Sequence, residues 1–182
     1  MALFIALLAA TATPGPCTTD PNNACKHVCT FNNLTVPLDF SEFNEQGGAK
    51  GYLEATDSAG RSYFFDACQP ERNVTCAGTG VGLPAAIQAW SGSPPALPAD
   101  SCASLGDATT KKCVMDTNYP RVQISCNSTN GDGGRTVHFK YVCDSRYHFY
   151  ASQTAGIAYE LDLVGPAACA PHGFPGRPWE SA

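Results

Sequence analysis

The chain has 182 residues, of which 43% are hydrophobic and 15% are charged, and its formal net charge is −5. This length is typical of one domain and is sufficient to bury a core without metal ions. The acidic balance provides no basic surface for nucleic acid or for an anionic membrane, so neither partner is expected.

The first twelve residues are interpreted as a signal peptide. An apolar run from Met1 to Ala10 has the length of a signal sequence, and Ala10-Thr11-Ala12 resembles a cleavage site. The mature chain is therefore expected to begin near Thr13. No later stretch approaches the roughly 18 apolar residues that a transmembrane helix needs. The expected location is the lumen of the secretory pathway or the outside of the cell.

Ten cysteines agree with that compartment, because an even set of this size is typical of a disulfide framework. There is no C-x-x-C pair, and Cys25 and Cys29 have no second ligand pair at zinc spacing. We expect no metal and no cofactor. With the cysteines oxidised, and with no Ser/His/Asp constellation, we do not expect an enzyme. Three sequons, at Asn33, Asn73 and Asn127, are candidates for N-glycosylation.

The chain then divides into a lead and a β-rich domain. Residues 13–30 contain Cys17, Cys25 and Cys29 among polar residues and are interpreted as an irregular, stapled segment. Residues 31–170 form the expected domain. In it, Tyr52–Thr56 and Arg61–Cys68 flank the turn sequence DSAG, which predicts a hairpin.

Further strands follow in the second half of the domain. Pro84–Trp90 and Arg121–Cys126 are predicted strands, and the proline-rich stretch 91–100 is a predicted surface loop. Residues 136–143 alternate apolar and polar side chains, as do residues 158–164, and the polar stretch between them is predicted to be a turn region. The Gly-rich stretch 78–82 lacks the helix and acidic residue of a dinucleotide site. Residues 171–182 are predicted to be an unstructured tail.

Many short strands separated by Gly, Pro and Asn predict an all-β fold, a disulfide-stapled flattened barrel or sandwich of two antiparallel sheets. Each of the two late strands ends in a cysteine. Arg135 precedes Cys143 by eight residues and Tyr159 precedes Cys169 by ten. Because both separations are even, each polar residue is expected on the same strand face as its cysteine.

Two late segments share a pattern with a known family. The first has GRT at residues 134–136 and CD at 143–144, and the second has Tyr159 and then PAAC at 166–169. This pattern resembles the C-terminal half of the mannose-6-phosphate receptor homology domain. Residues 63–70, YFFDACQP, are similar to the family's Y-x-F-N-x-C-x-P, and residues 85–88, AAIQ, to its A-A-V-C-Q strand. The resemblance covers residues 33–169. It implies a Cys143–Cys169 disulfide and a Cys29–Cys68 disulfide, and it leaves the other six cysteines open.

The resemblance also implies a site for a terminal mannose formed by Gln88, Arg135 and Tyr159. The chemistry suits a polyol, because Gln offers an acceptor and two donors and Arg offers five donors in a rigid plane. A site that binds hydroxyl groups in this way rejects sugars that lack them. The expected partners are mannose-containing glycans or glycoproteins.

Two departures from the family pattern qualify that expectation. The family's Glu, about ten residues before the Tyr, is absent, and Ser152 and Gln153 are the polar candidates to replace it. Phosphate-recognising members carry a disulfide whose two cysteine positions correspond to Asn130 and Ile157 in this chain. The absence of both cysteines favours unphosphorylated mannose as the ligand. The functional hypothesis is a lectin for mannose-type N-glycans in sorting or quality control. The alternative is a structural or protein-interaction module on the same scaffold that does not bind sugar.

Overall fold

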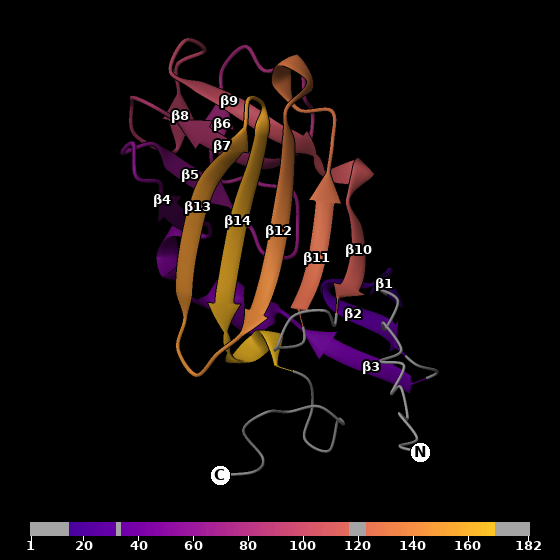
Figure 1. Ribbon diagram of the computed structural model, residues 1–182. Helices are drawn as coiled ribbons and strands as arrows, with labels where there is room; N and C mark the ends of the chain where they lie inside the picture. The colour runs from indigo at the N-terminus through magenta and orange to yellow at the C-terminus, as the bar shows by residue number, and fades with distance from the viewer. Residues whose placement is uncertain (1–14, 32–33, 117–122, 170–182) are drawn as a thin grey trace, which may run out of the picture.

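Two sheets of unequal size pack face to face in the computed structural model, which describes residues 15–31, 34–116 and 123–169 (Figure 1). The larger sheet has eight strands in the order β13-β14-β12-β11-β10-β1-β2-β3, and the smaller has four in the order β4-β5-β7-β9. A third, two-stranded ladder joins β6 and β8. The predicted all-β, disulfide-stapled sandwich is confirmed, although its sheets do not close into a barrel.

The strands of the larger sheet are β1 (Gly15–Asp20), β2 (Asn23–Phe31), β3 (Leu34–Asp39), β10 (Lys112–Asp116), β11 (Gln123–Ser128), β12 (Thr136–Cys143), β13 (His148–Ala155) and β14 (Ala158–Gly165). The other strands are β4 (Leu53–Thr56), β5 (Ser62–Phe65), β7 (Pro84–Ala89), β9 (Cys102–Asp107), β6 (Thr75–Cys76) and β8 (Ala96–Leu97). The helical segments are short: α1 (Ser41–Glu45) and the 3-10 turns η1 (Gly48–Lys50), η2 (Ala108–Thr110), η3 (Asp132–Gly134) and η4 (Pro166–Ala168).

Alternation of apolar and polar residues decides which face of β12 and β14 is buried. Val137 and its alternate neighbours along β12 lie inside, and the residues between them are partly exposed. β14 shows the same pattern. The two strands run parallel, with Val137 beside Tyr159, whereas every other pair of neighbours in this sheet is antiparallel. A parallel pair requires a crossover, and here β13 forms part of it and then pairs with the far edge of β14 (Figure 1).

Two sequence interpretations are wrong. The segment between the two late strands is not only a polar turn region, because β13 occupies His148–Ala155. The cysteine-rich lead is not an irregular segment, because β1 and β2 form a hairpin within the large sheet, with one register shift between Thr19 and Asp20. β13 has mostly exposed side chains and so little apolar alternation. In β2 the buried face carries Cys25, His27 and Cys29 while Val28 is exposed, so burial does not follow an apolar pattern there. The predicted signal peptide and the predicted tail from residue 171 lie outside the described residues.

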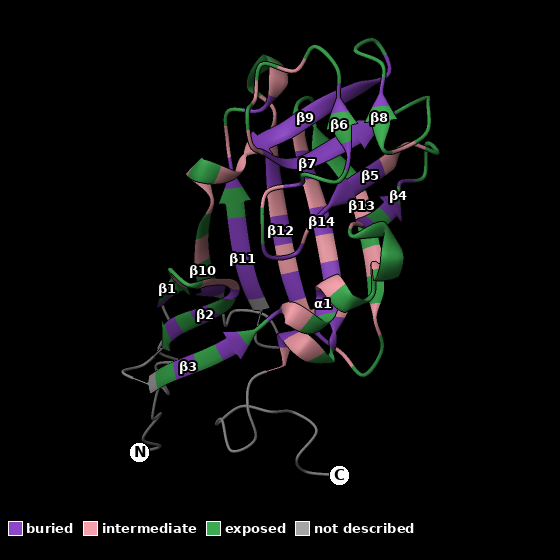
Figure 2. Cartoon of the chain, turned by 180° about the vertical axis from the view of Figure 1, so that it is seen from behind, coloured by how far each residue is buried: buried purple, intermediate pink, exposed green. Residues whose placement is uncertain are grey.

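Aromatic side chains fill the space between the sheets. The ring of Tyr141 stacks on that of Phe40 at 4.1 Å between centroids, and its hydroxyl donates to the carbonyl of Ala67 at 2.5 Å. Every residue of β7 is buried, because a second apolar cluster that includes Ile87 and Leu97 covers the outer face of the smaller sheet (Figure 2). The smaller sheet is therefore the middle layer at this end of the molecule.

All ten cysteines form disulfides, in five pairs: Cys17–Cys29, Cys25–Cys68, Cys76–Cys102, Cys113–Cys126 and Cys143–Cys169. The expected Cys143–Cys169 bond is confirmed. The expected Cys29–Cys68 bond is wrong, because Cys29 lies directly opposite Cys17 in the β1–β2 ladder. Cys25 takes the place next to Cys68 and so links the two sheets.

Candidate functional site

The hairpin of β4 and β5 positions the first polar group of the candidate site. Asp57 occupies the start of its turn and accepts hydrogen bonds from the backbone amides of Ala59 (2.9 Å) and Arg61 (3.0 Å). Gly60 lies in the left-handed region at φ 78°, where a residue without Cβ is favoured. The turn thus holds the Asp57 carboxylate and the Arg61 guanidinium on the same side of the hairpin.

A continuous chain of planar polar groups begins at this carboxylate. Arg61 Nε and the Tyr63 hydroxyl both donate to Asp57 Oδ2, at 2.7 and 2.8 Å. Gln88 Nε2 donates to the Tyr63 oxygen at 2.8 Å, and Arg61 Nη1 donates to Gln153 Oε1 at 2.6 Å. The chain therefore joins β7 and β5 in the smaller sheet to the edge strand β13 of the larger sheet. Its Gln88 end is buried and its Gln153 end is exposed.

Electrostatics keep this chain in one protonation state near neutral pH. Burial raises the pKa of Asp57, but the hydrogen bonds from Arg61 and Tyr63 outweigh it and hold that pKa below its usual range. Burial and the neighbouring Asp57 raise the pKa of Tyr63 well above its ordinary value. Tyr63 therefore keeps its proton, which it donates to Asp57, while its oxygen accepts from Gln88.

Of the three residues predicted to bind sugar, Gln88 belongs to this chain and Tyr159 lies beside it. Gln88 and Tyr159 are only 3% and 4% exposed, and both contact Tyr63, whose ring centroid lies 6.2 Å from that of Tyr159. Gln153 lies directly opposite Tyr159 in the β13–β14 ladder, whereas Ser152 lies opposite Glu160. Directly opposed residues share a face of the sheet. Gln153 is thus the candidate on the Tyr159 side, and Ser152 is on the other face.

Arg135, the third predicted residue, lies just before β12. Its backbone is extended and it precedes Val137, the neighbour of Tyr159, by two residues, or about 6.6 Å along the strand. The alternation of β12 puts it on the inner side, as Tyr159 is. Its Nη1 donates to the carbonyl of Asp132 at 2.6 Å. Its Nε is buried and finds no hydrogen-bond acceptor among the described residues.

Asp132 fastens the turn that carries Arg135. Its Oδ1 accepts from the Thr79 hydroxyl (3.0 Å) and the Gly80 amide (3.2 Å), and its Oδ2 accepts from the Ser104 amide (2.8 Å). Gly131 beside it packs so closely on β9 that a methyl group would collide with the Gly106 amide. The Gly-rich loop is thereby tied to the start of β12, and the Asp132 carboxylate is fully engaged by protein donors.

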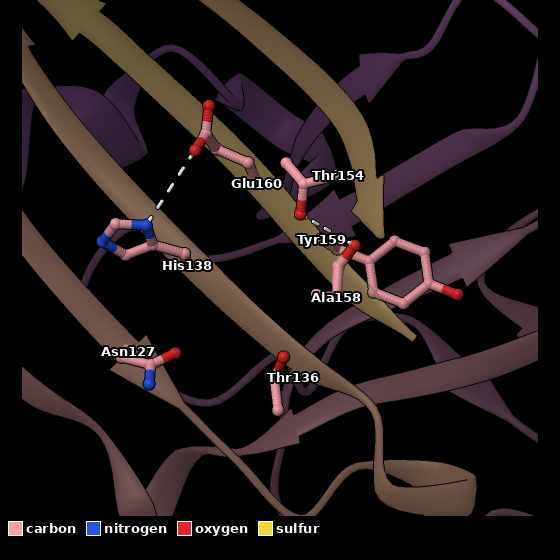
Figure 3. A pocket seen from close by; sticks show the side chains of 7 residues that line it. All are labelled: Asn127, Thr136, His138, Thr154, Ala158, Tyr159 and Glu160. Atoms are coloured by element: carbon pink, nitrogen blue, oxygen red, sulfur yellow. Dashed lines mark hydrogen bonds and ion pairs between the residues drawn. The ribbon is translucent and has the colours of Figure 1, made fainter. Parts of the chain in front are cut away.

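The opposite face of the large sheet carries an open hollow of about 340 Å³ (Figure 3). Its lining residues are Asn127, Thr136, His138, Thr154, Ala158, Tyr159 and Glu160. The Tyr159 ring points away from the other labelled side chains, so the strand and not the ring contributes here (Figure 3). Lys140 Nζ and His138 Nδ1 lie 2.5 and 3.9 Å from Glu160 Oε2.

The three sequons differ in what the structure shows of them. Asn127 is exposed on β11 and lines the hollow. Asn73 is exposed too, but its Nδ2 donates to the Gly51 carbonyl at 2.5 Å. Asn33 lies outside the described residues.

Sequence reasoning missed Asp57, Arg61 and Tyr63 as members of the site, because it treated them as a turn and a strand. One signal was present: a charged pair flanking a predicted hairpin turn, with an aromatic hydroxyl two residues after the Arg. Within residues 15–31, 34–116 and 123–169, no group of His, Cys, Asp and Glu side chains could hold a metal ion.

No known protein-family model matches this chain, and no curated protein matches it in sequence. Among the described residues, no helix is long and apolar enough to cross a membrane. The five disulfides are compatible with a secreted or lumenal protein.

Proposed function

We propose that this chain is a lectin for mannose-type N-glycans on glycoproteins of the secretory or endolysosomal pathway. The observation that carries the proposal is the hydrogen-bonded chain from Gln88 through Tyr63 and Asp57 to Arg61 and Gln153. It reaches the surface beside Tyr159, where the resemblance to the mannose-6-phosphate receptor homology family places a sugar site.

The exposed end of the chain has the chemistry that a sugar needs. The Arg61 side chain is 31% exposed and is held by the buried Asp57, so its guanidinium is fixed in orientation while part of it faces solvent. The Gln153 amide accepts from Arg61 Nη1 and donates to the Gly156 carbonyl, and its second N–H and the second lone pair of its oxygen are left for a ligand. A guanidinium and an amide held side by side in this way suit vicinal hydroxyl groups. Because both groups are already ordered, little conformational entropy is lost on binding.

Gln153 takes the place of the family's Glu, which this chain lacks. An amide oxygen in register with Tyr159 accepts from a hydroxyl group as a carboxylate would, without a negative charge. Arg135 contributes a buried Nε for which residues 15–31, 34–116 and 123–169 offer no acceptor, and an unsatisfied buried donor of this kind is rare in folded proteins. A ligand oxygen on the inner side of β12 would satisfy it.

The test is binding of immobilised high-mannose N-glycans to the purified, disulfide-bonded chain. Gln153→Ala removes an exposed amide together with its bonds to Arg61 and to the Gly156 carbonyl, and affinity should fall about tenfold, as loss of one or two polar contacts to the sugar predicts. Ser152→Ala is the matched control, since Ser152 lies on the same strand but on the other face. Equal affinity of the two variants would exclude this site.

The alternative, a structural or protein-interaction module, is favoured by one observation: the Gln88 amide already has a partner inside the protein. If the wild-type chain binds no mannose-containing glycan while remaining folded, this alternative replaces the lectin.

A further inference from the structure

The hollow on the outer face of the large sheet is separate from the lectin site proposed above. The two are on opposite faces of β14, since Tyr159 faces inward and Glu160 faces outward. The hollow, at about 340 Å³, is at the lower end of the range for small-molecule sites and is large enough for one sugar ring.

Asn127 forms one wall of this hollow. It lies opposite His138 in the β11–β12 ladder, so both side chains are on the same face. Figure 3 shows Asn127 next to His138 and Thr136 on the neighbouring strand. The sequon continues as Ser128 and Thr129. Because Asn127 lines the hollow, a group attached to its Nδ2 would begin at the edge of the hollow.

The remaining walls are polar and suited to hydroxyl and acetamido groups. Burial, reinforced by Lys140, lowers the pKa of His138, so its ring is neutral near pH 7 and presents one donor and one acceptor. The Glu160 carboxylate is an acceptor whose charge is offset by Lys140 at 2.5 Å. The Thr136 hydroxyl adds a further donor and acceptor.

We propose that Asn127 carries an N-linked glycan whose first N-acetylglucosamine lies in this hollow against Thr136, His138 and Glu160. The host's transferase forms the bond: Asn127 Nδ2 attacks C1 of a lipid-diphosphate-linked oligosaccharide, the C1–O bond breaks, the lipid diphosphate leaves and one amide proton is released. The product amide keeps one N–H. The glycan then covers the otherwise open outer face of β11, β12 and β14.

The experiment uses the full chain secreted from a host that performs N-glycosylation. Glycopeptide mapping should find glycan on the peptide that contains Asn127, and Asn127→Gln should lose it. Peptide N-glycosidase should release this glycan about tenfold more slowly from the folded chain than from the denatured chain, because two or three hydrogen bonds hold the first sugar.

Variants of the hollow distinguish binding of the first sugar in the hollow from general steric shielding of the glycan by the folded protein. Thr136→Val and His138→Ala should each speed release from the folded chain several-fold. Lys112→Ala is the control, since Lys112 lies opposite Asn127 on the other neighbouring strand and does not line the hollow. An unmodified Asn127, or release rates that the hollow variants leave unchanged, would overturn the proposal.

Discussion

Asp57 is the single residue on which the polar chain depends. Its side chain is 4% exposed and accepts from Arg61 and Tyr63, so its loss would leave buried donors without partners. Asp57→Asn should lower the free energy of unfolding at pH 7 by about 3 kcal/mol. Asp39→Asn is the control: the pKa of Asp39 is also lowered, by Ser41, but its side chain is 50% exposed, and the expected change is below about 0.5 kcal/mol.

The same variant predicts a pH dependence. The pKa of Asp57 is lowered in the folded state. The contribution of its charge to the free energy of unfolding is therefore present above the unfolded-state pKa of about 3.9 and is lost as pH falls through the folded-state pKa. Urea unfolding from pH 7 to pH 2 should show wild type and Asp57→Asn converging below about pH 4. A constant difference in unfolding free energy over that range would show that the charge of Asp57 is not what stabilises the hairpin.

At the level of residues, the sequence named Gln88 and Tyr159 as candidates for one site but not Tyr63, which contacts both. Tyr63 bonds to one and packs on the other, and it does so because the smaller sheet lies across the larger one. Alternation along a strand predicts on which face of its own sheet a side chain lies. Which residues of the other sheet that side chain contacts depends on how the two sheets pack. Gln153 could be separated from Ser152 only once the register of β13 was known.

Among elements, β12 and β14, whose alternation is strong, were predictable, and the exposed edge strand β13 was not. β12 and β14 are half-buried, so every second residue is apolar. β13 is exposed over most of its length, and its Ser, Gln and Thr side chains look like those of a loop. Disulfide partners depend on the order of strands in the sheet, which is why the Cys29 pairing was wrong. The Cys143 pairing was right: it joins the end of β12 to Cys169, which follows the neighbouring strand β14 by way of η4.

The disulfides should contribute unequally. Cys25–Cys68 spans 43 residues and links the sheets, whereas Cys17–Cys29 spans 12 within one hairpin. Because a longer closed loop restricts the unfolded chain more, replacing both cysteines of the first pair by Ala should cost about 4 kcal/mol and of the second about 3 kcal/mol. Urea unfolding of the two double variants at the same pH tests this. A greater loss for the Cys17–Cys29 variant would mean that strain or packing outweighs loop closure.

The whole molecule has three layers at one end and two elsewhere. The β6–β8 ladder and the chain around it pack on the outer face of the smaller sheet through the cluster that contains Ile87 and Leu97. The main core lies on the other face of that sheet and includes Leu161. This outer layer is held by a smaller apolar cluster, the Cys76–Cys102 bond and the bonds of Thr79 and Gly80 to Asp132. Because its cluster is smaller than the main core, it should open without unfolding of the sandwich.

Hydrogen exchange on two core variants tests this division. Leu97 is 2% exposed and Leu161 is fully buried, so each Leu→Ala substitution should cost about 2–5 kcal/mol by transfer and cavity terms. Leu161→Ala should speed exchange of amides throughout β12 and β14, because those strands exchange only on global unfolding. Leu97→Ala should act mainly on the outer layer, where the Thr75 and Ala77 amides donate to Pro95 and Leu97. If Leu97→Ala instead raised exchange in β12 as much as in the outer layer, the outer layer and the sandwich would form one cooperative unit.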